Sequence, residues 1–360
     1  MKMKSLAIKL AAVCLVVGTL FLLQRLVMPK YVSGIVEGSL IEAYYTETTP
    51  HDVLFVGDCE VYESFSPITL WNDYGITSFI RGSAQQLIWQ SYYLLEETLT
   101  YEKPEVVVFN VLSLKYNEPQ KEAYNRLTLD GMKLSMSKIR LIQASMLEGE
   151  NFLDYLFPIL RYHARWNKLT GEDFKYMFSK EKLFHNGYYM RVDVKPVTTV
   201  PVGKILPDYR FGDNAYHYLD LMSDLCKKNG IALVLVKVPS LYPYWYDEWE
   251  QQMDDYAVRH NLKYVNFLEL TDEIGLDFKT DTYDTGLHMN LSGAEKVSKY
   301  FGQFLRNSYQ VPDHRDDEKL KTVWAEKTAF YQQMMKSQYA ELEALGYLKS
   351  LGAKNPNEPD

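Results

Sequence analysis

Five short apolar runs, separated by segments of helical periodicity, dominate the pattern of hydrophobic and polar positions in this chain. The third and fourth runs are nearly continuous in Val, Leu and Ile, which is typical of parallel strands buried on both faces. Alternation of such runs with helices predicts an α/β fold built on a doubly wound, five-stranded parallel sheet. The predicted strands are Asp52–Val56, Ile76–Ile80, Glu105–Leu112, Ile231–Val238 and Lys263–Phe267, and the predicted helices around them are Gln85–Thr98, Tyr216–Lys228, Tyr244–His260 and Leu291–Arg306.

A long insertion, from about 116 to 209, interrupts this alternation between the third and fourth strands. An insertion at the carboxyl end of a strand is well placed to cover a site, because ligands gather at that end of a parallel sheet. A further helix is predicted within 310–351, and the polar segment 352–360 is predicted to be disordered. The helical pieces predicted in the insertion are Arg126–Leu147, Phe152–Arg165 and Glu172–Phe178.

The N-terminal segment predicts a membrane anchor. Leu10–Leu23 carries no charge, and the surrounding apolar segment Leu6–Met28 has 23 residues. That length crosses a hydrocarbon layer of ~30 Å at about 1.5 Å per residue. The lysines before it place the N-terminus in the cytoplasm, and no small-x-small cleavage motif follows it. We therefore expect an uncleaved single-pass anchor over 1–30, followed by an extracellular domain over 31–309.

Composition narrows the class of protein further. Of the 360 residues, 47% are hydrophobic and 24% are charged, which is ordinary for a globular domain. The net charge of -8 argues against nucleic-acid binding, which needs a basic surface. Outside the anchor there are only Cys59 and Cys226, so no disulfide framework is expected. No Cys/His cluster has metal-ligand spacing, so we expect neither a metal nor an organic cofactor.

The first candidate for chemistry is Gly57-Asp58-Cys59, directly after the first predicted strand. A nucleophile at such a junction lies at the edge of the sheet, where its own backbone N–H can face an oxyanion. A thiol is easier to ionise than a serine hydroxyl, so Cys59 is a suitable nucleophile. The alternative is a buried cysteine that simply ends a strand.

The second candidate is Asp284 with His288, in the loop before the helix Leu291–Arg306. A carboxylate can hold the imidazole in one tautomer while the imidazole takes the proton of a nucleophile. The alternative is an ordinary surface histidine.

Taken together, these two segments resemble the first and last motif blocks of the SGNH/GDSL hydrolase superfamily, which has a flavodoxin-like sheet. The resemblance implies that Cys59 is the nucleophile, His288 the general base and Asp284 its orienting acid. It also implies an oxyanion hole from the backbone of Cys59 and of Gly82, which lies in Arg81-Gly82-Ser83 after the second strand. The N-terminal anchor makes the chain similar to the membrane-anchored branch that includes the D-alanine transfer protein of teichoic-acid modification and polysaccharide O-acetyltransferases.

Three positions depart from the family pattern. Cys59 stands where the family has serine, and the acid precedes His288 by four residues instead of three. The asparagine of the third block is absent, since that position carries Leu114. Asn110 is the nearest substitute, and we expect it to assist the oxyanion hole.

Five further residues are predicted to contact substrate: Asp58, Gln85, His163, Arg165 and Lys237. Lys237 ends the fourth strand, where it either binds an anionic polymer or is a solvated strand end. The segment His163-Ala-Arg165-Trp166 resembles a feature of the same branch. Side chains two apart on a helix do not share a face, so at most one of His163 and Arg165 would reach substrate.

The resemblance implies an extracytoplasmic acyltransferase that moves an acetyl or D-alanyl group onto a hydroxyl of a cell-wall or secreted polymer. It also implies a multi-pass membrane-bound O-acyltransferase as partner, because the acyl donor does not cross the membrane unaided. One alternative is an esterase that deacylates such polymers. Another is a catalytically inactive polymer-binding or scaffold protein, because Asp58 and Glu60 flank Cys59 and would raise the pKa of its thiol.

Overall fold

Five parallel strands form the single sheet of the computed structural model, which describes residues 2–29, 40–178 and 185–351. Their order is β2-β1-β3-β4-β5, and every neighbouring pair is parallel. This is the flavodoxin-like order. The predicted fold class is therefore confirmed. The strands are β1 (Val53–Gly57), β2 (Ser78–Gly82), β3 (Val106–Asn110), β4 (Ala232–Lys237) and β5 (Lys263–Asn266).

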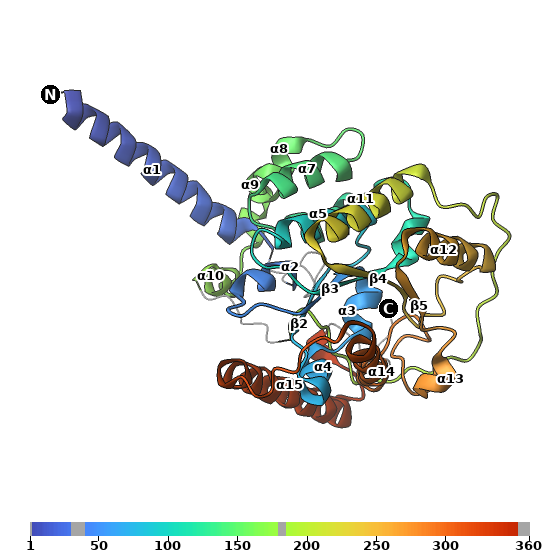
Figure 1. Cartoon of the computed structure of the whole chain (residues 1–360). Helices are drawn as coiled ribbons and strands as arrows, with labels where there is room; N and C mark the ends of the chain where they lie inside the picture. Colours follow the sequence, from blue (N-terminus) through green and yellow to red (C-terminus); the bar gives the residue numbers. More distant parts are fainter. Residues whose placement is uncertain (1, 30–39, 179–184, 352–360) are drawn as a thin grey trace.

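Helices cover both faces of the sheet (Figure 1). Along β1, Leu54 and Val56 pack into one core, whereas Val53 and Phe55 pack into the other. Because successive side chains of a strand point to opposite faces, a strand covered on both sides has to be apolar throughout. The first layer comprises α5 (Ile88–Thr98), α11 (Asp213–Asn229) and α12 (Asp247–His260), and the second comprises α3 (Cys59–Ser64), α4 (Pro67–Tyr74), α14 (Leu291–Tyr309) and α15 (Glu318–Leu345).

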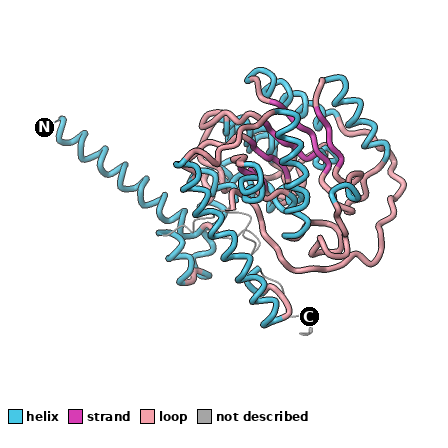
Figure 2. The backbone as a smooth tube through the Cα atoms, turned by 60° about the horizontal axis from the view of Figure 1, so that its bottom comes forward, coloured by secondary structure: helices cyan, strands magenta, loops and turns pink. Residues whose placement is uncertain are grey.

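The insertion between β3 and β4 is helical, but its helices are shorter than predicted. The predicted helix Arg126–Leu147 is interrupted at Gly131, where a Cβ would crowd the side chain of Ile41. The predicted helix Phe152–Arg165 is interrupted at Pro158, which has no N–H to continue the preceding turn. From residue 185 the chain runs as a long loop to α11, visible in pink in Figure 2. The insertion contains η4 (Val111–Lys115), α6 (Glu122–Leu129), α7 (Met136–Ser145), α8 (Phe152–Leu156), α9 (Ile159–Tyr162), η5 (His163–Lys168) and α10 (Gly171–Phe178).

The N-terminal helix α1 (Lys2–Val27) projects away from the globular body (Figures 1 and 2). Among the described residues it is the one helix long and apolar enough to cross a membrane, over Leu6–Val27 with a mean hydropathy of 2.5. This agrees with single-pass anchoring. The orientation across the membrane and the division into an anchor and an extracellular domain stay predictions. The tail 352–360, predicted to be disordered, lies outside the described residues.

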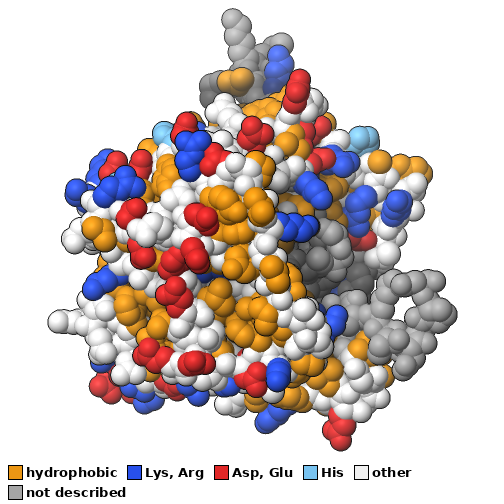
Figure 3. Space-filling model, turned by 90° about the vertical axis from the view of Figure 1, so that its right-hand side faces the viewer, with side chains coloured by type: hydrophobic (Ala, Val, Ile, Leu, Met, Phe, Trp, Pro, Cys, Tyr) orange, Lys and Arg blue, Asp and Glu red, His pale blue; other side chains and the backbone are white. Residues whose placement is uncertain are grey.

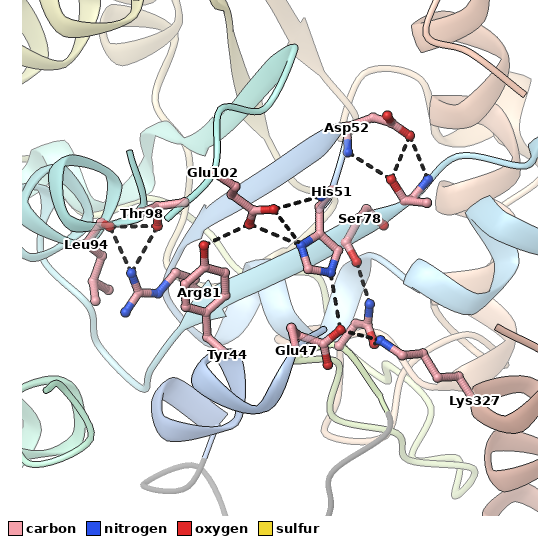
Figure 4. Close-up of polar contacts among 12 residues, drawn as sticks. Tyr44, Glu47, His51, Asp52, Ser78, Arg81, Leu94, Thr98, Glu102 and Lys327 are labelled. Atoms are coloured by element: carbon pink, nitrogen blue, oxygen red, sulfur yellow. Dashed lines mark hydrogen bonds and ion pairs between the residues drawn. The ribbon is translucent and has the colours of Figure 1, made fainter. Parts of the chain in front are cut away.

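A buried ion-pair network at the amino end of β1 joins distant segments of the chain (Figure 4). The Nδ1 of His51 lies 3.1 Å from the Glu102 carboxylate, and its Nε2 lies 3.4 Å from Glu47. Lys327 of α15 donates a hydrogen bond to Glu47 at 2.5 Å. Burial alone would lower the pKa of His51, but the two carboxylates outweigh it and raise that pKa. The C-terminal helix is thus held by charges as well as by the stacking of Trp324 on Trp71.

Four short elements complete the fold: α2 (Leu40–Ala43), η3 (Tyr44–Thr46), α13 (Thr271–Ile274) and η6 (Lys349–Leu351).

Candidate active site

Cys59 lies at the junction of β1 and α3, at the carboxyl edge of the sheet. Strand β1 ends at Gly57, Asp58 is the N-cap, and Cys59 is the first residue of α3. A Cβ at Gly57 would overlap the side chain of Val61. The glycine therefore lets the helix begin directly after the strand. This tight junction leaves Cys59 partly exposed, while the residues around it are buried.

His288 comes from a loop that precedes α14. An isolated antiparallel bridge between Thr282 and Met289 closes this loop. At its tip, Thr285 has φ 65° and Gly286 has φ 95°, so both adopt the left-handed region. A β-branched residue is rarely found there. The left-handed turn accommodates the extra residue between Asp284 and His288.

The turn brings Asp284 directly against His288. One carboxylate oxygen of Asp284 lies 2.6 Å from Nδ1 of the imidazole, and the other accepts a hydrogen bond from the His288 backbone N–H at 2.8 Å. Two contacts to one carboxylate fix both the ring and the backbone. The carboxylate favours the neutral tautomer that carries its proton on Nδ1, and this tautomer leaves Nε2 free to accept a proton.

The thiol of Cys59 lies near the His288 imidazole, and each group shifts the pKa of the other. The Nε2 of His288 is buried and has no hydrogen-bond partner within the described part of the chain. Because Asp284 occupies Nδ1, Nε2 is the nitrogen that remains for the thiol. Catalytic hydrogen bonds are commonly loose before substrate binds. The structure therefore brings Cys59, His288 and Asp284 into one row.

A second carboxylate, from Glu63, also faces the imidazole. Its Oε2 lies 3.5 Å from Nδ1 of His288 and accepts a hydrogen bond of 2.5 Å from the Tyr283 hydroxyl. Glu63 is four residues after Cys59 on α3, so the two side chains share a face of the helix. His288 is thus flanked by two acids, whereas the sequence predicted one.

These charges set the protonation of the site. Burial raises the pKa of the Cys59 thiol to about 11, Asp58 and Glu63 act in the same direction, and His288 opposes them. Burial would lower the pKa of His288, but Glu63, the Cys59 sulfur and the Asp284 hydrogen bond raise it well above its usual value. At neutral pH the thiol therefore keeps its proton, and the neighbouring carboxylates favour the charged form of the imidazole. The neutral form of His288, which a general base requires, is disfavoured by the same charges.

No protein-family model and no curated protein matches the chain. A similar solved structure is that of a protein from Desulfitobacterium hafniense DCB-2, described as a lipolytic protein of the G-D-S-L family. The two share 10% sequence identity with a TM-score of 0.35, and the match covers 70% of this chain and 98% of that one.

A buried polar cluster lies beneath the nucleophile position. The Asn110 amide donates to Asp58 at 3.3 Å and to Glu60 at 2.9 Å. Glu60 also accepts from the Ser240 hydroxyl at 2.5 Å and lies 3.8 Å from the Lys237 ammonium. Burial, and after it the charge of Glu60, raises the pKa of Asp58 to about 6.

This cluster corrects two predicted roles. Both amide hydrogens of Asn110 are donated to carboxylates, so its side chain has no free donor for an oxyanion. Lys237 is fully buried and donates to Val238 and Ser240, so it is neither a surface for an anionic polymer nor a solvated strand end. A buried ammonium needs a charge partner, and Glu60 supplies it. The carboxylate of Asp58 is likewise turned into the cluster.

The two predicted residues of the second motif lie at the same edge of the sheet. Gly82 ends β2 and is in register with Gly57, two residues before Cys59. A Cβ at Gly82 would come within 3.0 Å of the Gly57 carbonyl oxygen, so the close approach of the two strand ends requires glycine. Gln85 follows in a left-handed turn with φ 52° and is half-buried.

His163 and Arg165 do not belong to this site. Arg165 donates to the Val27 carbonyl oxygen at the end of α1 and pairs with Asp173 at 2.9 Å. His163 contacts the Leu160 carbonyl oxygen. The predicted substrate contacts are therefore wrong for both residues, because the insertion turns this segment towards the anchor.

Sequence reasoning missed Glu63, Tyr283 and Lys115. The first two had a local signal, since Glu63 is one helical turn after Cys59 and Tyr283 directly precedes Asp284. Lys115 ends η4, and its ammonium interacts with the charges of Asp58 and Glu60, while burial lowers its pKa. Within the described ranges, no group of three or more His, Cys, Asp or Glu side chains is arranged to hold a metal ion.

Proposed function

We propose that this chain is a membrane-anchored enzyme that transfers acyl groups through a thioester on Cys59. The observation that supports this proposal is the position of the Cys59 thiol near the His288 imidazole, whose Nδ1 lies 2.6 Å from the Asp284 carboxylate. Nucleophile, base and orienting acid in that order are the groups that acyl transfer needs. The row lies at the carboxyl edge of a parallel sheet, where ligands of such folds bind.

The reaction has two balanced halves. With His288 in its neutral form, the sulfur of Cys59 attacks the acyl carbonyl while its proton passes to Nε2 of His288, and the imidazolium then returns that proton to the departing group of the donor. In the second half, the acceptor hydroxyl attacks the thioester, its proton goes to Nε2, and the sulfur leaves and takes the proton back. Glu63 and Asp284 stabilise the imidazolium that forms in each half.

The acceptor that we propose is a hydroxyl of a cell-wall or secreted polymer, and the acyl group is acetyl or D-alanyl. A candidate membrane span followed by a globular domain suits chemistry at a cell surface. An acyl donor on the other side of the membrane would need a membrane-bound O-acyltransferase as partner. If water takes the place of the hydroxyl, the same residues make the chain an esterase.

A second candidate is a binding protein without catalysis. It is favoured by one observation, the pKa of about 11 for the Cys59 thiol, which leaves little thiolate at neutral pH. In this case the polar edge of the sheet would hold a polymer without acylating it.

The test uses the full-length chain in lipid nanodiscs with an activated acetyl ester, with and without an acceptor polymer. Wild type is expected to gain one acetyl group on the peptide that contains Cys59, and Cys59→Ala and His288→Ala are expected to lose both the adduct and turnover. Cys59→Ser should keep part of the activity. Cys226→Ala, which removes a buried thiol from α11, is the matched control and should behave like wild type.

The result also separates the candidates. An adduct consumed only when polymer is present supports transfer, and one consumed by water supports an esterase. Polymer binding without any adduct, unchanged in Cys59→Ala, would leave the binding protein as the function.

A further inference from the structure

A group of exposed apolar side chains lies in the insertion elements from α8 to α10, next to the end of α1. Trp166 is 72% exposed and Phe178 is 76% exposed. On a soluble protein, a patch of apolar side chains that are exposed to this extent marks an interaction site. We call this surface the anchor-side apolar face. Its members are Leu153, Phe157, Leu160, Trp166, Phe174 and Phe178.

The insertion is attached to the point where α1 enters the globular body. Arg165 donates to the carbonyl oxygen of Val27, and the backbone N–H of Ile159 donates to the side chain of Gln24 at 3.4 Å. Helices α9 and α10 and the turn η5 all contact α1. Along α1, side chains are exposed as far as Leu23, and the segment from Gln24 onward is half-buried or buried. The last turn of α1 is therefore part of the globular body.

This attachment determines which side of the domain faces the membrane. If α1 crosses a bilayer up to about Leu23, the elements packed around its last turn lie at the depth of the lipid headgroups. Figure 1 shows α8, α9 and α10 gathered around that end of α1, on the side of the body from which α1 projects. Figure 3 looks at the opposite side of the molecule, where apolar side chains are interspersed with acidic and basic ones.

We propose that the anchor-side apolar face rests in the interfacial layer of the same bilayer that α1 crosses. Its composition suits this location, since aromatic rings with one wet edge are favoured at the headgroup level. Phe174 and Phe178 are four apart on α10 and share one face, while Asp173 points the other way, to Arg165. The exposed lysines Lys168 and Lys175 can extend their ammonium groups to lipid phosphates.

The occupant is phospholipid and not a second protein because the face adjoins a helix that is itself lipid-exposed. Leu22 and Leu23, directly before the packed turn of α1, are 45% and 44% exposed, so the apolar surface continues from the anchor towards the insertion. A second contact would prevent the domain from swinging freely on its anchor and would hold it at one orientation to the membrane. This inference rests on α1 as a membrane span and not on catalysis by Cys59.

Trp166 provides the test, because it is exposed while the other five of the six tryptophans are buried. The full-length chain is reconstituted into vesicles of phosphatidylcholine and phosphatidylglycerol, with or without bromine on the acyl chains near the headgroups. Brominated lipid is expected to quench part of the wild-type tryptophan emission, and Trp166→Phe is expected to lose this quenching. The double substitution Phe174→Ser with Phe178→Ser should weaken it, whereas Val258→Ser, at an 81% exposed position of α12 on the far side, should not.

Three results would overturn the proposal. One is Trp166 emission that brominated lipid leaves unchanged while aqueous acrylamide quenches it as strongly in vesicles as in detergent. Another is protection of Trp166 that appears only when a second membrane protein is reconstituted with the chain. The third is failure of the chain to float with the vesicles, which removes the anchor itself. If the double variant does not fold, the difference in quenching by brominated lipid between wild type and Trp166→Phe is sufficient to decide whether Trp166 contacts the bilayer.

Discussion

The protonation of Cys59 is the property on which the proposed chemistry depends most directly, and the structure makes a quantitative prediction about it. Burial and the neighbouring carboxylates raise the pKa of this thiol to about 11, and His288 is the main group that acts in the opposite direction. The perturbations are therefore pH itself and the substitution His288→Gln, which removes the main opposing charge while keeping a polar side chain of similar size.

The magnitude follows from the thiolate fraction. An ordinary cysteine with a pKa of about 8.5 is roughly one quarter thiolate at pH 8. A thiol with a pKa of about 11 is only ~0.1% thiolate at that pH. A more basic thiolate is also the better nucleophile, by about ten- to twentyfold for this difference. Alkylation of Cys59 should therefore be about ten- to twentyfold slower than that of an unperturbed cysteine at pH 8.

The assay is alkylation of the full-length chain by iodoacetamide from pH 6 to pH 10, with the modified peptide that contains Cys59 quantified by mass spectrometry. The rate should rise about tenfold for each pH unit over this whole range, because the pKa lies above it. In His288→Gln the rate at pH 8 should fall further, since the removed imidazolium lowered the thiol pKa. His260→Gln, at the end of α12 and away from the site, is the matched control.

This reasoning would be refuted if the alkylation rate of wild-type Cys59 reached a plateau near pH 6 or 7 and that plateau were absent in His288→Gln. It would mean that Cys59 and His288 rest as a thiolate–imidazolium pair and that the carboxylates do not prevent ionisation. Retained helical circular dichroism at each pH excludes unfolding as the cause.

Three further predictions concern stability, each measured as thermal unfolding of the full-length chain in detergent. His51→Gln should lower the free energy of unfolding by on the order of 3 kcal/mol, because it removes the cation between two buried carboxylates. Since the folded state raises the pKa of His51, this loss should be complete below about pH 6.5 and shrink as the pH rises through the folded-state value; a loss that grows with pH would contradict it. Lys237→Met should cost about 3–5 kcal/mol by leaving Glu60 without its cation, whereas an unchanged melting temperature would show that Lys237 is a surface residue after all. Trp324→Ala should cost about 3–5 kcal/mol and expose α15 to limited proteolysis, because Trp324 is fully buried against Trp71; resistance to the protease would argue against that packing.

Much of the fold could be predicted because its signals are local. The Val-rich runs around Val106–Phe109 and Leu233–Val236 are buried on both faces, as continuous hydrophobicity predicts. Element ends were less accurate: the third strand stops at Asn110, and a 3₁₀ turn takes the residues that follow. In the insertion, apolar spacing alone predicted two continuous helices, and the structure shows that they are interrupted at Gly131 and Pro158. Periodicity reports which face is buried and carries little information about where a helix ends.

The sequence by itself determined the parallel sheet, the candidate span, and the two loops that carry Cys59 and His288, because the carboxyl ends of parallel strands share one edge wherever they lie in the chain. Only the tertiary structure decided which charged side chains are buried and which groups they pair with. Lys237 is buried because Glu60, far away along the chain, occupies the same interior, and His288 gains a second acid because α3 turns Glu63 towards it. Burial of an apolar side chain is driven by its own hydrophobicity, so the local pattern of apolar residues in the sequence predicts it. Burial of a charge depends on a partner that only the folded chain supplies.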